Sequence, residues 1–370
     1  MMFVLAVLLG CPTSSQPIAA ETVPEGPPSP LADQPFEALP RDGLAEVARY
    51  RFARSHYGVD VEGRATLLVV RESLDEVSLL KTNQGGGAPA IKLMLMKTLP
   101  SMNWDHRDNF ALYSAEDLKP LKLAITAEEW CGNNFLEWRD TPQGAQRIGR
   151  PYTDDTSVVT DTVPIATGYH LYEQLPLLVR AATTAPLELR LVGPQTAYLP
   201  PHADLLDVTL APAGTERLTT PAGTFETVRV DVTPQAPTFA FPSPESYWLD
   251  KDQRFVVKAE RHEYGTEFGK PHVTTATYTL LDHERSAYWS SAVGPATAEL
   301  SDRVRATSSS AMQIALQKAT ADRRGSMFSL DNLPAEYLSD PAGNRNFSGA
   351  QDGKGGWTVD AAGRFVPNVP

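Results

Sequence analysis

The chain has 370 residues, a hydrophobic fraction of 42% and a formal net charge of −12. Its 45 acidic residues outnumber its 33 basic ones, which argues against sequence-independent nucleic-acid binding, because that binding needs a basic surface. The chain has only two cysteines, so we expect no disulfide framework and no thiolate metal site, and a hydrophobic core must hold the folded part together.

The first eleven residues form a short apolar run that ends in Leu8-Leu9-Gly10-Cys11. The run is too short to span a bilayer, which takes about 20 residues, and it fits the apolar region of a secretory signal. It resembles the lipobox of bacterial lipoproteins, in which a small residue precedes a cysteine that is lipidated and becomes the mature N-terminus. The resemblance implies a lipidated Cys11 and a protein tethered to a membrane. No Lys or Arg precedes the run, which leaves open a start further upstream, an ordinary cleaved signal or a cytoplasmic protein.

Residues 12–40 are rich in proline, and we predict that they form a spacer between the lipid and a folded body. Proline lacks the amide donor and favours extended backbone, so such a stretch builds neither helix nor sheet. Pro12 follows Cys11 where inner-membrane lipoproteins carry an aspartate. Its presence favours the outer membrane, with the body facing the periplasm. A plain disordered tail is the alternative.

Between about residues 44 and 285, apolar residues recur with period two, which is typical of strands with one buried face. Residues 225–232 place their valines on one face and polar side chains on the other, and residues 187–191 alternate leucines with charges. Such alternation belongs to antiparallel sheets with one solvated face. We therefore predict a mainly β domain over residues 41–285, a large curved antiparallel sheet or half-barrel.

Turns and one helix are also expected within this domain. Pro221 and Gly223 favour a tight turn between two strands, and the polar residues 250–254 favour a second hairpin. The one helix expected lies around residues 172–182, with Pro176 at a tolerated early position.

Two hairpins within residues 205–285 carry a resemblance to a known family. Residues 218–225 read "LTTPAGTF", and residues 247–249 and 256–260 read "YWL" and "VVKAE". This pattern is similar to that of uncharacterised Gram-negative envelope proteins that are likened to the lipoprotein-carrier fold. The resemblance implies a curved sheet wrapped partway around a hydrophobic space, in the cell envelope. It implies no chemistry.

Cys131 is the residue that supports a specific chemical hypothesis. In Trp130-Cys131-Gly132 it resembles half of a thioredoxin motif, although the second cysteine is absent. A lone thiol is a nucleophile when a neighbouring base lowers its pKa, whereas a buried cysteine acts as a small apolar residue. Strand parity with Leu123 and Ile125 favours the buried residue.

Other patterns give no catalytic residue, metal site or cofactor. The seven histidines include no i, i+4 pair and no H-E-x-x-H motif, although His262 and His272 could meet across a hairpin. There is no G-x-S-x-G elbow and no Walker A loop.

Residues 286–370 change in character. The runs "SLDNL" at residues 329–333 and "GKGGW" at residues 353–357 resemble the C-terminal part of a pseudopilin domain. The long apolar helix that drives filament assembly in that family is missing here, and a loosely packed Gly- and Pro-rich tail is the alternative.

These observations together predict a membrane-tethered envelope lipoprotein that acts as a binding or scaffolding module. Its ligand would be hydrophobic, such as an acyl chain on the concave side of the sheet. Two alternatives stay open: a thiol-dependent enzyme centred on Cys131, and an assembly protein associated with pili or secretion.

Overall fold

The computed structural model describes residues 25–287, apart from 57, 83–85, 101–104, 130–131, 153–157, 200, 202 and 268–269, together with strands at 357–359 and 365–367. The chain divides into two compact units, Met1–Ala287 and Tyr288–Pro370. We call the described part of the first unit the body. No helix in the described ranges is both long and apolar enough to cross a bilayer.

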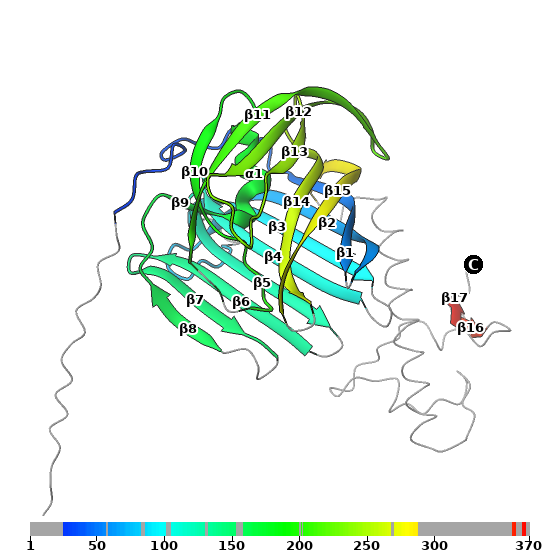
Figure 1. The fold of residues 1–370 in the computed structure, drawn as a ribbon, viewed down its shortest axis with the longest axis horizontal. Coiled ribbons are helices and arrows are strands. Elements are labelled where there is room, and N and C mark those ends of the chain that lie inside the picture. The colour runs from blue at the N-terminus through cyan, green and yellow to red at the C-terminus, as the bar shows by residue number, and fades with distance from the viewer. Residues whose placement is uncertain are drawn as a thin grey trace, which may run out of the picture. The chain divides into compact units, whose positions relative to one another are not determined.

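The body is built on one sheet of 15 strands, which confirms the predicted fold class (Figure 1). The first half of the body contains β1 (Ala45–His56), β2 (Val59–Leu74), β3 (Ala88–Pro100), β4 (Asp105–Ala115), β5 (Pro120–Glu129), β6 (Gly132–Thr141), β7 (Gly144–Arg150) and β8 (Val159–Val163). The second half contains β9 (Tyr169–Leu171), β10 (Leu187–Val192), β11 (Leu205–Thr220), β12 (Gly223–Pro234), β13 (Glu245–Asp250), β14 (Val256–Glu267) and β15 (Lys270–Ser286).

Chain order and strand order agree except at one place. Strands β1 to β8 form one antiparallel meander, and β10 to β15 form a second. The two meanders join where β1 pairs antiparallel with β15, and β9 adds to the second meander by pairing parallel with β10. Strands β8 and β9 therefore stand at the two ends of the sheet, which stays open between them.

One short helix follows β9, as the sequence predicts. The 3₁₀ turn η1 (Tyr172–Gln174) leads directly into α1 (Leu175–Ala181), with Pro176 in its first turn, where the missing amide costs no helical hydrogen bond. The curved sheet wraps around this helix (Figure 1), and Leu175, Leu177 and Leu178 are fully buried. A segment of the same chain thus lies on the concave side of the sheet.

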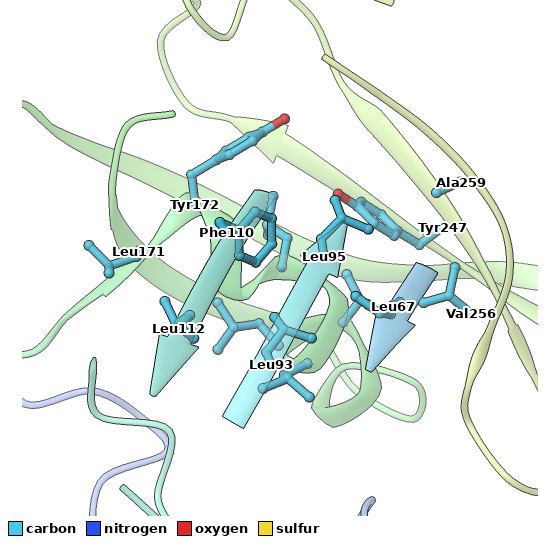
Figure 2. Packing of buried hydrophobic residues seen from close by; sticks show 14 of the residues in the cluster. Leu67, Leu93, Leu95, Phe110, Leu112, Leu171, Tyr172, Tyr247, Val256 and Ala259 are labelled. Carbon is cyan, nitrogen blue, oxygen red and sulfur yellow. The ribbon is translucent and has the colours of Figure 1, made fainter. Parts of the chain in front are cut away.

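Alternation along the strands builds the core. Leu93, Leu95, Phe110 and Leu112 lie on the neighbouring strands β3 and β4 and are at most 7% exposed. Figure 2 shows these side chains in the same cluster as Tyr172, Leu171 and residues of the second meander. The apolar period of two therefore marks the inward face, as predicted.

The second half of the proline-rich stretch belongs to the body, which corrects the predicted spacer over residues 12–40. Phe36 and Leu39 are 6% and 1% exposed and join the core cluster. The Phe36 amide donates to the Glu116 carbonyl at 2.8 Å, and the Ser29 hydroxyl lies 2.8 Å from His170 Nε2. Proline excludes regular ladders but not packing, and two apolar side chains bind this segment to the sheet. Residues 12–24 lie outside the described part.

The second unit is described only at β16 (Trp357–Val359) and β17 (Phe365–Pro367), which pair antiparallel. The rest of the segment that resembles a pseudopilin lies outside the described residues, so that resemblance stays a prediction.

Candidate functional site

Among the residues predicted as functional, only Gly132 falls in the described part of the chain. Cys11, Trp130 and Cys131 lie outside it. Gly132 opens β6 and pairs with Glu129, and a Cβ at this position would stand 2.7 Å from Cγ of the Tyr152 ring. Gly132 is thus required by close packing against a tyrosine.

The interior of the body holds a group of buried and half-buried ionisable residues that the sequence analysis did not single out. Lys97 on β3 and Asp108 on β4 come from the first meander, while Glu245 on β13 and Arg261 and Glu263 on β14 come from the second. We call these five residues the interior cluster. Charged side chains are seldom buried unless they are paired, so each member needs a partner.

Glu263 is the centre of the interior cluster. Its Oε2 accepts a hydrogen bond from Lys97 Nζ, and its Oε1 accepts one from the Tyr278 hydroxyl at 2.5 Å. Arg261 Nε lies 3.8 Å from the same Oε1. Burial alone would raise the pKa of Glu263, but Lys97 and Arg261 outweigh burial and hold that pKa at about 2. Glu263 is therefore an anion at all physiological pH values.

Glu245 is a buried acid whose pKa is raised, whereas that of Glu263 is lowered. The Tyr172 hydroxyl lies within hydrogen-bond distance of both Glu245 Oε1 and the His262 carbonyl oxygen, the latter at 2.9 Å. Glu245 Oε1 also accepts from the His262 amide at 2.7 Å, and its Oε2 accepts from the Tyr247 hydroxyl at 3.0 Å. Burial raises the pKa of Glu245, although Arg261 opposes the rise. Glu245 is thus a buried carboxyl that accepts from three donors and whose charged form Arg261 stabilises.

The interior cluster continues toward the far ends of β4 and β5. Lys97 Nζ lies 3.9 Å from Asp108 Oδ2, and the Tyr198 hydroxyl donates to Asp108 Oδ1 at 3.1 Å. Further along the same strands, His106 Nδ1 lies 3.0 Å from Glu129 Oε1. A carboxylate that binds one ring nitrogen of a histidine orients the ring. Glu129 is two residues from Cys131 in sequence.

Glu173, in η1, is a further buried acid. Its Oε1 accepts a hydrogen bond from the Gln195 amide at 2.8 Å, and its Oε2 has no hydrogen-bond partner among the described residues. Burial raises the pKa of Glu173 to about 7, although the Gln195 amide opposes the rise. Glu173 therefore titrates near neutrality.

A cavity of about 30 Å³ lies beside the interior cluster. Its walls are Tyr50, Leu67, Leu95, Pro176, Tyr247, Val256, Ala259, Arg261 and Tyr278. A site needs roughly 10–15 Å³ of such volume for each water molecule, so this cavity holds about two waters. It is far smaller than an acyl chain requires.

The histidines do not converge on a metal site within the described residues. His262 pairs with Thr275 across the β14–β15 hairpin and His272 with Gly265, so the expectation that these two histidines could meet is wrong. The described part of the chain contains no group of three or more His, Cys, Asp or Glu side chains arranged to hold a metal ion.

Comparisons with known proteins find structural neighbours only. No family model matches the sequence, and no curated protein matches it. A β-barrel-like protein of the domain of unknown function DUF1849 from Brucella abortus is similar at a TM-score of 0.41 and 8% identity, over 65% of this chain and 98% of that one. A candidate lipoprotein from Parabacteroides distasonis is similar at a TM-score of 0.21 and 10% identity, over 68% of this chain and 99% of that one. A candidate outer-membrane lipoprotein-sorting protein domain from Vibrio parahaemolyticus is similar at a TM-score of 0.19 and 9% identity, over 67% and 87%.

Proposed function

We propose that this protein is a lipid-anchored envelope protein whose β body acts as a binding or scaffolding module. The observation that carries the proposal is the N-terminal run ending in Leu8-Leu9-Gly10-Cys11. Acylation of Cys11 would tether the body to the membrane, and Pro12 favours the outer membrane, with the body facing the periplasm. The membrane is then the first partner, reached through the lipid.

The attachment of residues 25–40 to the body bears on the length of the proposed tether. The Gly26 amide donates to Thr167 Oγ1 at 3.1 Å, next to the open edge of the sheet at β9. A free spacer would then comprise residues 12–24, which span at most about 45 Å when fully extended. The spacer would thus leave the body on the side where the sheet is open.

The packing around α1 bears on the size of the ligand that the body could bind. Among the described residues, α1 lies on the concave side and the cavity beside it measures only about 30 Å³, so an acyl chain would enter that cavity only if α1 or a neighbouring segment moved. A module that binds small ligands inside, or proteins at its surface, fits the observed packing better than a preformed lipid carrier. Native mass spectrometry after gentle extraction tests the carrier role, and repeated absence of co-purifying lipid would reject it.

The anchor is tested by labelling with palmitate in the native host, using the true start codon. We expect label on the wild-type protein and none on the Cys11→Ser variant, and we expect the variant to leave the membrane fraction. Sucrose-gradient separation of the inner and outer membranes then locates the wild type. If a known lipoprotein in the same cells is labelled and this protein is not, the proposal is wrong.

The His106–Glu129 pair favours a second candidate, the thiol-dependent enzyme centred on Cys131. Glu129 lies two residues before Cys131 in sequence, and an oriented histidine is the usual base that activates a thiol. Alkylation of the native protein discriminates between the two roles of the cysteine. Fast labelling near neutral pH that slows in His106→Gln supports the enzyme, while no labelling before unfolding indicates a core residue.

A further inference from the structure

The loop between β2 and β3 exposes two large apolar side chains. Val77 is 91% exposed and Leu80 is 61% exposed, and both lie within residues 75–82. Moving an apolar side chain of this size out of water is favourable, because the free energy gained grows with the area removed from water. Two such side chains on one loop form a contact point for an apolar partner.

Hydrogen bonds hold this loop in one shape. Asp75 Oδ1 accepts from the Ser78 amide at 2.7 Å and from the Ser78 hydroxyl at 2.8 Å. The Asp75 amide donates to the Leu80 carbonyl oxygen, and the Leu79 amide donates to the Asp75 carbonyl oxygen, both at 2.9 Å. Lys122 Nζ on β5 donates to the Leu79 carbonyl oxygen at 2.9 Å. The loop is thus fixed to the sheet, so docking its apolar side chains needs little further ordering.

The loop lies at the end of the sheet where the proposed tether leaves the body. Strands β2 to β5 form part of one meander, so the β2–β3 loop and the β4–β5 turn lie at the same end of these strands. The Ser29 hydroxyl contacts His170, and His170 Nδ1 lies 3.1 Å from the Leu118 carbonyl oxygen in that turn. Residues 12–24 would reach at most about 45 Å, so a lipid at Cys11 would keep this end of the body near the membrane.

Two other exposed apolar side chains lie at the opposite end of the strands. Val158, which is 64% exposed, directly precedes β8, and Phe239, which is 62% exposed, lies between β12 and β13. The connections that carry them join strand ends opposite to those joined by the β2–β3 loop. Exposure alone therefore does not distinguish the two ends, whereas the position of the tether does.

We propose that Val77 and Leu80 insert into the surface of the bilayer that holds the N-terminus, and that this contact orients the body on the membrane. The inference rests on the proposed tether, because two side chains alone bind a bilayer weakly and a tether raises their effective concentration at its surface. The chain has a net charge of −12, and Lys81 in this loop is paired with Glu72 at 2.9 Å. A zwitterionic phospholipid therefore fits this surface better than an anionic one.

The test supplies the tether by a route that does not depend on Cys11. The chain from residue 12 onward carries a histidine tag at its N-terminus and is bound to a nickel-chelating lipid in phosphatidylcholine vesicles. A phosphatidylcholine with a diazirine in its acyl chain is then activated by light, and mass spectrometry of peptides locates the labelled residues. We expect label on residues 75–82 and none on residues 235–244.

Variants identify the side chains that make the contact. Val77→Ser/Leu80→Ser should lower the label on residues 75–82 at least about tenfold, because these two side chains supply the free energy of insertion. Val158→Ser/Phe239→Ser removes two apolar side chains of comparable exposure at the opposite end and should leave that label unchanged. All four positions are exposed, so both double variants should fold, which circular dichroism checks.

Undiminished label on residues 75–82 of a folded Val77→Ser/Leu80→Ser would overturn the proposal. So would equal label on residues 75–82 and 235–244 of the wild type, because the body would then have no fixed orientation on the bilayer. If the loop stays unlabelled while palmitate labels Cys11 in the host, the anchor stands and the loop contact is wrong. If the loop is labelled while Cys11 carries no palmitate, the loop contact stands and the anchor is wrong.

Discussion

The ion pair between Arg180 and Glu46 joins the interior helix to the sheet, and its removal has a calculable cost. Arg180 Nη1 and Nη2 donate to the two oxygens of Glu46 at 2.8 and 2.7 Å, and Nε donates to the Pro176 carbonyl at 2.9 Å. The Arg180 side chain is 0% exposed and the Glu46 side chain 5%. Neither charge can reach water when its partner is removed.

Arg180→Met keeps the length of the side chain and leaves Glu46 buried without its main counter-ion. Breaking such a pair on one side costs about 3–5 kcal/mol. Arg285 and His283 also lower the pKa of Glu46, so part of the charge stays compensated, and we expect about 3 kcal/mol. The double variant Glu46→Met/Arg180→Met buries no charge and should lie within about 1 kcal/mol of the wild type, or above it.

The dependence on pH separates this mechanism from simple loss of packing. Burial pushes the pKa of Glu46 upward, but Arg180 outweighs it, and the net pKa lies below its ordinary value. In the wild type the pair therefore contributes stability above the unfolded-state pKa of Glu46, and this is lost as the pH falls through the lower folded-state pKa. In Arg180→Met, burial should raise that pKa, so the penalty should shrink as the pH falls and Glu46 takes up a proton.

Urea unfolding at pH 7 and pH 5, followed by tryptophan fluorescence and circular dichroism, measures these quantities. The two probes must give the same transition before a free energy of unfolding is quoted. A cost below about 1 kcal/mol for the single variant would refute the reasoning. A double variant that is as unstable as the single one would refute it too, because packing and not charge would then explain the loss.

Three further outcomes follow from the structure. Gly168 has φ +78°, and a Cβ there would lie 2.2 Å from the Pro27 carbonyl oxygen. Gly168→Ala should therefore lower the free energy of unfolding by about 1–3 kcal/mol and expose residues 25–40 to protease. Gly43→Ala, with φ +72° and no atom within 4 Å, is the control for backbone strain alone. Leu93→Ala in the core should cost about 2–5 kcal/mol in urea unfolding, whereas Val77→Ala, at a side chain 91% exposed, should cost less than about 0.5. Burial raises the pKa of Glu173 from 4.5 to about 7. The contribution of Glu173 to stability is therefore present below pH 4.5 and is lost as the pH rises through 7, a change of about 3 kcal/mol in the free energy of unfolding. Glu173→Gln should remove this change from the pH profile of stability.

Strand parity could be predicted from the sequence because each strand has one face toward the core. Val230 and Val232 on β12 are 0% exposed, while Arg229 and Asp231 between them are partly exposed. Pro221 and Ala222 form the turn between β11 and β12, as expected. Local chemistry decides these features, so one sequence suffices to find them.

The interior cluster could not be predicted from strand parity alone. Val257 and Ala259 point inward, and the same parity carries Arg261 and Glu263 inward two and four residues later. That signal was present in the sequence, but a charged residue on a strand is usually read as solvated. Only the pairing of β14 with distant strands shows that Lys97 reaches Glu263. The sequence shows that Glu263 points inward, but it does not show that Lys97 is its partner, so the site could not be predicted.

The interior cluster also explains how this open sheet keeps a single register. The Lys97–Glu263 contact spans 166 residues and joins β3 to β14, so it forms only after the two meanders have come together. The Arg180–Glu46 contact spans 134 residues and joins α1 to β1. A slip of one residue along β14 would turn Glu263 toward the outer face and leave Lys97 buried without its anion. The sheet is open between β8 and β9, so strand closure cannot fix that register. The buried charges fix the register instead, because a shifted pairing would leave at least one of them without its partner in the core.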